Sequence, residues 1–235
     1  MSSTKPTIVL VHGAIADGSS WSGVIERLQA KGYNVYAVQQ PLSSLPDDIA
    51  KVNDALDWIP GPVVLVGHSF GGIVITNAGN HAKVKALVYV AAFAPDENQS
   101  AADLGKDYAP LASGKAFQFD KQGRFYLTEP DFLKYFAPDV EPKKARAMAA
   151  AQGAADGARF VWKSGPAAWK NKPSYFVVSE NDQIIQHELE AFEAKKIKAV
   201  KTVSIPNASH AVLVSHPDPV TSLIVEAAEA VAKGH

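Results

Sequence analysis

The stretch GHSFG at residues 67–71 places Ser69 between two glycines, after the apolar run PVVLV and before a segment with helical spacing. A serine on a tight turn from strand to helix needs neighbours without side chains, because a Cβ two residues away on either side would strike the strand or the helix. Gly67 and Gly71 meet that need. The helix that follows also aims its positive end at the hydroxyl. The pattern therefore predicts that Ser69 is a nucleophile, whereas the alternative is a glycine-rich turn with a capping serine.

A serine nucleophile needs a histidine base within hydrogen-bonding reach and an acid that orients the base. Two histidines follow the last predicted strand: His210 in the loop IPNASHAVLV, and His216 where Pro217 indicates the start of the final helix. The others belong to the end of the first strand, the serine turn, helices or the tail (His12, His68, His81, His187 and His235). We predict His210 as the base and leave His216 as a surface or helix-start residue.

Two acidic residues compete for the role of the orienting acid. Asp182 follows the fifth predicted strand in FVVSENDQIIQ, and Asp96 follows the fourth in AAFAPDE. We favour Asp182, because Asp96 and Glu97 fit solvated loop charges at the start of an inserted segment. The chain order is then nucleophile, acid and base.

A serine nucleophile also needs two backbone N–H groups that stabilise the oxyanion of the tetrahedral intermediate. One donor should be Phe70, the residue after the nucleophile. The other should come from the loop VHGAIADGSSW, where Gly13 allows close approach of the backbone to a substrate. We predict the N–H of Ala14, with that of Ile15 as the alternative. Taken alone, His12-Gly13 also fits an ordinary turn at a strand end.

The elements that position these residues alternate between strand and helix. Continuous apolar runs predict strands that are covered on both faces (7–11, 34–38, 62–67, 84–92, 174–179 and 200–204). Helical spacing occurs between most of them and at the end (19–32, 46–59, 71–82, 186–199 and 217–234). The sequence predicts an α/β fold with a doubly wound, mostly parallel six-stranded sheet flanked by helices. Trp21 and Trp58 lie in predicted helices and are expected in the core.

Residues 96–172 interrupt this alternation and hold 11 of the 21 aromatic residues. Short helical segments at 129–139 and 141–152 predict a small helical lid, inserted after the fourth strand, over the edge where such sheets bind ligands. Residues 1–95 and 173–235 then form the core. Each lid aromatic by itself fits the core of the lid better than a substrate contact, but as a group these residues suggest an apolar acyl or alcohol pocket. The residues that we expect to contact the substrate are Ile15, His68 and Phe93 in the core and Trp162 in the lid.

Four motifs in this order, LVHGAIADGSSW, VLVGHSFGG, SENDQIIQ and ASHAVLVSHP, resemble the α/β-hydrolase superfamily over about residues 6–232. They are most similar to the compact esterases of its hydroxynitrile-lyase-like, plant esterase-like branch. The resemblance implies a carboxylesterase that forms an acyl-enzyme on Ser69, with His210 relaying the proton and Asp182 holding the imidazole. It implies a small-molecule ester substrate, no metal and no organic cofactor.

The lyases of that branch replace the glycine after the first-strand histidine by Asn, or the histidine-glycine pair by His-Thr, and one lineage has Lys after the catalytic histidine. This chain has Gly13 and Ala211 at those places, which favours a hydrolase. Two alternatives stay open. One is a lyase that uses the same triad on a cyanohydrin or a C–C bond, and the other is a ligand-binding protein with residual esterase activity.

Composition limits the other classes. The formal charge of -1 is spread over the chain, which indicates no nucleic-acid partner. The chain has no cysteine, which excludes disulfides and thiolate sites. HELEAF at 187–192 begins like a zinc-protease helix but has Ala191 where the second histidine must stand, so it is interpreted as a solvated helix face.

The apolar runs are too short for membrane insertion. The longest one, 86–94, is about half of a membrane span, and Ile8–Val11 is far shorter than the core of a signal peptide. We therefore expect no membrane partner and a cytoplasmic location. Nothing in the sequence distinguishes a monomer from a homodimer.

Overall fold

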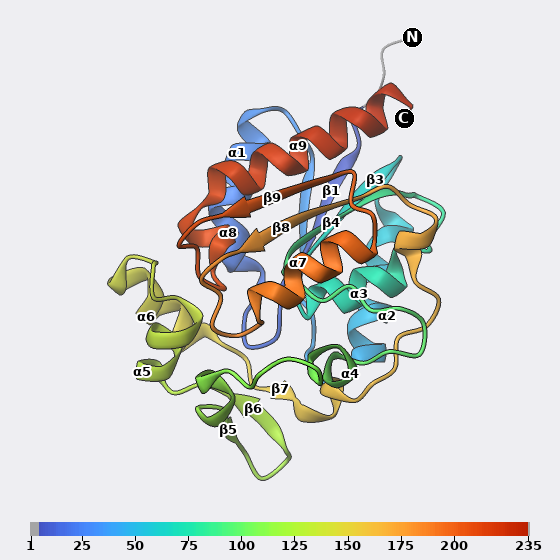
Figure 1. Ribbon diagram of the computed structural model, residues 1–235. Coiled ribbons are helices and arrows are strands. Elements are labelled where there is room, and N and C mark those ends of the chain that lie inside the picture. Colours follow the sequence, from blue (N-terminus) through green and yellow to red (C-terminus); the bar gives the residue numbers. More distant parts are fainter. Residues whose placement is uncertain (1–4, 235) are drawn as a thin grey trace.

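The computed structural model describes residues 5–234; residues 1–4 and 235 of the expected core lie outside the described residues. Six parallel strands form one sheet in the order β2-β1-β3-β4-β8-β9 (Figure 1). They are β1 (Thr7–Val11), β2 (Val35–Val38), β3 (Val63–Ser69), β4 (Val84–Ala92), β8 (Ser174–Ser179) and β9 (Lys201–Ile205). The predicted α/β fold class is confirmed.

Helices cover both faces of the sheet (Figure 1). One face holds α1 (Ser22–Ala30), the short α8 (Val212–Ser215) and α9 (Pro217–Lys233), and the other holds α2 (Leu45–Trp58), α3 (Gly71–Ala78) and α7 (His187–Lys196). Successive residues of β1 point to opposite faces of the sheet. Ile8 therefore packs on the face covered by α1 and α9, and Val9 on the face covered by α2 and α3. This two-sided burial explains why the strands are apolar at every position.

The two tryptophans expected in the core differ. Trp21 ends a 3₁₀ turn (Gly18–Trp21) before α1 and is fully buried. Trp58, the last residue of α2, is 61% exposed, so that expectation was wrong. The indole of Trp58 lies against the Tyr36 ring at the edge of the sheet, because β2 is the outermost strand and has no neighbour beyond it.

The strand order creates the place for a binding site. The chain moves from β1 to β2 on one side and then crosses to β3 on the other side of β1. Such a reversal leaves a crevice at the carboxyl ends of the two central strands, where open α/β sheets bind ligands. His12 follows β1 there and Ser69 ends β3 there.

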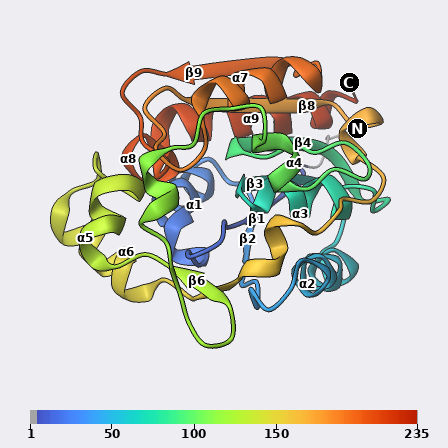
Figure 2. The same cartoon turned by 60° about the horizontal axis from the view of Figure 1, so that its bottom comes forward.

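The segment between β4 and β8 lies at the side of the molecule where these strand ends meet (Figures 1 and 2). It contains α4 (Ala101–Gly105), α5 (Glu129–Asp131), which continues as a π-helical turn (Phe132–Phe136), and α6 (Pro142–Ala151). It also contains 3₁₀ turns at Ala112–Lys115, Gly157–Phe160 and Ala168–Lys170.

A small antiparallel sheet in the same segment was not expected from the sequence. Its strands are β5 (Gln118–Phe119), β6 (Arg124–Tyr126) and β7 (Ala155–Asp156). The turn between β5 and β6 depends on Gly123, whose φ of 75° suits glycine. Within residues 5–234, no helix is both long and apolar enough to cross a bilayer.

Candidate active site

The serine turn has the strained geometry that its sequence predicts. Ser69 has a φ of 55°, in the left-handed region that non-glycine residues rarely adopt. A Cβ on Gly67 would lie 2.5 Å from the carbonyl oxygen of Gly71, and a Cβ on Gly71 would lie 2.5 Å from that of Val11. Both glycines are therefore required, and the sharp turn lifts the Ser69 side chain out of the sheet.

His210 and Asp182 form a fully buried pair. Nδ1 of His210 lies 2.5 Å from Oδ2 of Asp182. The other oxygen of Asp182 accepts hydrogen bonds from the N–H groups of Ile184 and Ile185, at 2.6 and 2.9 Å. Burial by itself raises the pKa of Asp182, but the His210 ring and these hydrogen bonds outweigh it and bring the pKa below its ordinary value. Asp182 is thus held ionised against the ring.

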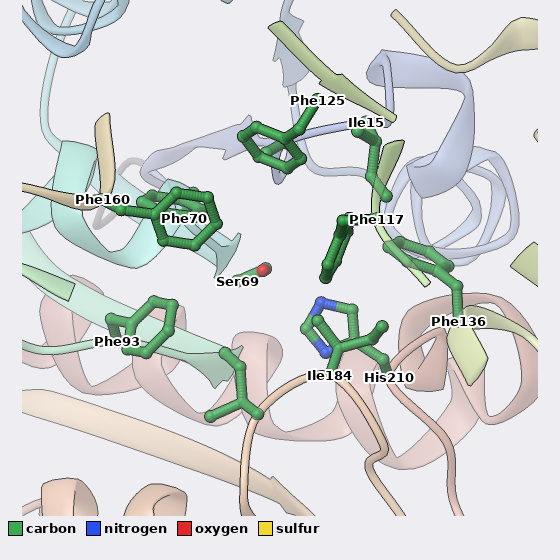
Figure 3. A pocket seen from close by; sticks show the side chains of 12 residues that line it. Ile15, Ser69, Phe70, Phe93, Phe117, Phe125, Phe136, Phe160, Ile184 and His210 are labelled. Atoms are coloured by element: carbon green, nitrogen blue, oxygen red, sulfur yellow. The ribbon is translucent and has the colours of Figure 1, made fainter. Parts of the chain in front are cut away.

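The opposite side of the His210 ring faces the serine. Its Nε2 atom is buried and has no hydrogen-bond partner among residues 5–234. His210 and Ser69 line the same cavity, and Figure 3 shows the serine hydroxyl pointing into it. An imidazole nitrogen that lines the same cavity as a serine hydroxyl can accept the hydroxyl proton once the two come within hydrogen-bonding reach.

The cavity is apolar apart from these two residues. It has a volume of about 50 Å³. The other lining residues are all hydrophobic (Ala14, Ile15, Phe70, Phe93, Phe117, Phe125, Phe136, Phe160, Ile184 and Ile185), and phenyl rings surround Ser69 in Figure 3. Since a water-sized group needs roughly 10–15 Å³, the cavity accepts only a few non-hydrogen atoms.

Ile15 and Phe93, two expected substrate contacts, are among the lining residues, whereas Ile184 and Ile185 were not anticipated. They lie two and three residues after Asp182, with Gln183 in between. Their position just beyond an acid at a strand end was the signal that could have identified them.

The loop after β1 borders the cavity through Ala14 and Ile15. The His12 ring fixes this loop, because its Nδ1 lies 2.8 Å from the Gly13 carbonyl oxygen while Nε2 accepts the Gln40 N–H at 3.0 Å. Burial lowers the pKa of His12, consistent with a neutral ring that donates from Nδ1. In a trans peptide the N–H points opposite to the carbonyl, so the Ala14 N–H points away from His12. Ala14 and Phe70 both line the cavity beside Ser69.

The next residue of this loop is strained. Ile15 has a φ of 50°, an unusual value for a β-branched side chain. Such strain persists only where the surroundings impose it, and it concentrates at functional sites.

Two expected substrate contacts lie elsewhere. His68 does not line the cavity; its Nε2 lies 2.8 Å from the His210 carbonyl oxygen, on the far side of the serine turn. Burial, followed by the nearby His210, lowers the pKa of His68 to about 3, so that its neutral ring donates this bond and supports the His210 loop. Successive residues of a strand point to opposite faces, which directs the His68 side chain away from that of Ser69.

Trp162 is 41% exposed and lies in a surface groove with Ala158, Val161 and Lys163.

The rival residues do not join the site. Asp96 forms an ion pair with Lys170 at 2.5 Å near the surface. His216 precedes α9 and contacts Ser215 through Nδ1 at 2.9 Å. Across the described ranges, no cluster of three or more His, Asp or Glu side chains is arranged to hold a metal ion.

A comparison with protein families identifies this architecture. Residues 8–223 match the model of the alpha/beta hydrolase family. The chain belongs to this family. The match covers the sheet from Ile8 onward, the serine turn, Asp182 and His210. The candidate site of this α/β hydrolase therefore lies within the matched region.

The relatives of this α/β hydrolase include proteins named as a hydrolase, a methylesterase and a lyase. It is 27% identical to the alpha/beta hydrolase nvfD of Aspergillus novofumigatus, over 95% of this chain and 97% of that protein. It is 31% identical to methylesterase 7 of Arabidopsis thaliana, over 57% of this chain and 60% of the relative. It is 25% identical to the alpha-hydroxynitrile lyase of the same plant, over 91% and 93%.

Among solved structures, this α/β hydrolase is similar to polyneuridine aldehyde esterase. The TM-score is 0.83 at 18% identity, and the alignment covers 95% of this chain and 99% of that one. At this identity the likeness establishes the fold. Together with the relatives, it supports the plant esterase-like branch of the family.

Proposed function

We propose that this α/β hydrolase is a serine carboxylesterase that hydrolyses esters with a small, uncharged, apolar acyl group. The observation that carries the proposal is that Ser69 and His210 share one apolar cavity, with Asp182 bonded to the far side of the His210 ring. A cavity without any charged group favours an uncharged substrate, because a buried charge without a partner is costly.

In the proposed reaction Ser69 Oγ attacks the ester carbonyl carbon while His210 Nε2 takes the hydroxyl proton. The resulting imidazolium is stabilised by ionised Asp182. The N–H groups of Ala14 and Phe70 stabilise the oxyanion. The C–O bond to the alcohol then breaks, and His210 returns its proton to the leaving oxygen. A water molecule, deprotonated by His210, then attacks the acyl carbon. The bond to Ser69 Oγ breaks, His210 returns the proton to Oγ, and the acid is released.

The size of the cavity sets the acyl preference. With room for only a few atoms, we expect the best turnover at acyl chains of about two to four carbons. The test is the initial rate on p-nitrophenyl esters from acetate to octanoate, with the free acid quantified. Ser69→Ala should lower kcat by about 10³-fold or more. Ser222→Ala, which alters a serine on the distant α9, should behave as the wild type.

A lyase is the second candidate, favoured by the similarity to the alpha-hydroxynitrile lyase. It would cleave a cyanohydrin to a carbonyl compound and cyanide without forming an acid. Formation of these products, together with no acid from any ester, would support the lyase and refute the esterase. Ester hydrolysis that survives in Ser69→Ala would refute the assignment of Ser69 itself.

A further inference from the structure

A second buried carboxyl group lies directly behind Asp182. Glu190, in the first turn of α7, is 0% exposed. Its Oε2 accepts the N–H of Ser179, the last residue of β8, at 2.8 Å. Ser179 in turn accepts the backbone N–H of Asp182 at 3.2 Å, so the two acidic residues meet at the same strand end, close enough for the charge of Asp182 to act on the Glu190 carboxyl group. The helix face that the sequence predicted to be solvated is therefore buried at this position, beside the predicted catalytic acid.

Two carboxyl groups in contact require a proton between them, because two adjacent buried negative charges repel each other strongly. The surrounding donors decide which group keeps it. Asp182 faces three donors, namely two backbone N–H groups and the His210 ring. Glu190 has one N–H donor, and its Oε1 is buried without any donor from the described residues. The proton therefore belongs on Glu190.

The pKa values agree with this distribution. Burial, followed by the charge of Asp182 and their hydrogen bond, raises the pKa of Glu190 well above its ordinary value. The pKa of Asp182 is lowered.

We propose that Glu190 is a positioning residue that stays protonated during turnover and donates a hydrogen bond to the Asp182 carboxylate. This inference rests on the proposed triad function and adds a fourth side chain to it. The donated bond draws negative charge from Asp182 and so weakens its hold on a proton of the His210 ring. Without Glu190, Asp182 would stabilise the imidazolium more strongly. The pKa of the His210 ring would then be higher, and a higher pH would be needed to obtain the neutral ring that acts as the base.

Other groups near this cluster have fixed charge states or other partners. His68, on β3, is neutral beside the His210 ring. Asp139, in the inserted segment, is bonded to Ser209. These groups are unchanged in the variants below.

Glu193 provides a matched control on the same helix. It is also 0% exposed, and its Oε2 accepts a backbone N–H at a strand end, that of Ala94, at 2.7 Å. Unlike Glu190, whose pKa responds to the charge of Asp182, it forms an ion pair with Lys196. Changing Glu193 therefore tests the structural role alone.

The experiment measures the rate at which a fluorophosphonate reagent labels Ser69 between pH 4 and pH 9, followed by intact mass, for wild type, Glu190→Gln, Glu190→Leu and Glu193→Gln. This readout follows activation of the serine by His210 and needs no natural substrate. Glu190→Gln keeps a neutral donor, so we expect its acid limb within about 0.3 pH units of the wild type. Glu190→Leu should shift the limb upward by about one pH unit. Glu193→Gln should not shift it.

The outcomes are separable. A downward shift of about one unit in Glu190→Gln would show that the native carboxyl is ionised, and it would overturn the proposal even if Glu190→Leu fails to fold. An unshifted Glu190→Leu would also overturn it. Absence of labelling in the wild type would refute the serine mechanism instead. The Glu190 proposal would then be decided by NMR titration of the His210 ring in the same variants, with the same expected shifts.

Discussion

Nδ1 of His210 lies 2.5 Å from Oδ2 of Asp182, and both side chains are completely buried. A buried contact this short fixes the orientation of the ring and the nitrogen that carries its proton. Nε2 is then the nitrogen left to accept the serine proton.

Asp182→Asn should therefore lower kcat by about 10³- to 10⁴-fold with little change in folding, because an amide fixes the wrong ring tautomer. The measurement is kcat on p-nitrophenyl acetate, with circular dichroism to verify folding. The control is Asp96→Asn, which breaks a surface ion pair with Lys170 and should change kcat by no more than about twofold. A larger effect at Asp96 than at Asp182 would reverse the assignment of the acid.

Gly13→Ala should impair catalysis through contact with the nucleophile. A Cβ at this position would lie 2.9 Å from the Cβ of Ser69 and 3.3 Å from Nδ1 of His68. Ser69 is held in a strained turn and has no room to retreat, so we expect a loss of about 10²-fold in kcat. A Cβ added at Gly105 would meet no atom within 4 Å beyond its chain neighbours and its own helix backbone, so Gly105→Ala should retain activity. Equal kcat in the two variants would contradict close packing of this loop against Ser69.

Phe160→Ala should widen the acyl preference. Its ring lies 5.0 Å from those of Phe70 and Phe125, centroid to centroid, and lines the cavity. Removing it creates space for a longer chain, so the ratio of octanoate to acetate turnover should rise about tenfold. Phe119→Ala, at a residue that is 61% exposed and does not line the cavity, is the control. An unchanged ratio in Phe160→Ala would place the acyl group elsewhere.

Glu190→Gln should stabilise the protein at high pH. The folded-state pKa of Glu190 is raised, so the stability that its proton contributes is fully present below the ordinary glutamate pKa and is lost as pH rises toward the raised value. Glutamine does not titrate. Within that window, the free energy of unfolding of the wild type should fall relative to the variant by about 1.4 kcal/mol per pH unit.

Urea denaturation at pH 5 and pH 8 measures this difference. Glu188→Gln, at an exposed position of the same helix, should show the same pH dependence as the wild type. Parallel pH dependence of wild type and Glu190→Gln would contradict a protonated Glu190 in the folded state.

The sequence by itself determined the core of this protein. Two-sided burial leaves a continuous apolar run, so all six strands of the main sheet were predictable to within two residues. Gly67 and Gly71 reveal the serine turn because no other residue fits there. These signals are local, since each depends on a few neighbouring residues.

Only the tertiary structure decided which polar side chains are buried and what they contact. In HELEAFEAKK the charged residues look alike, yet Glu190 and Glu193 are buried because α7 packs beside the end of β8 and the residues just after β4. There Glu190 accepts the N–H of Ser179, and Glu193 accepts that of Ala94. Strand alternation turns the His68 ring away from Ser69, but only the fold brings the His210 carbonyl oxygen to that ring. Trp162 lies in a surface groove, which its sequence does not reveal. Partners far apart in the chain are brought together by folding, and no local pattern records them.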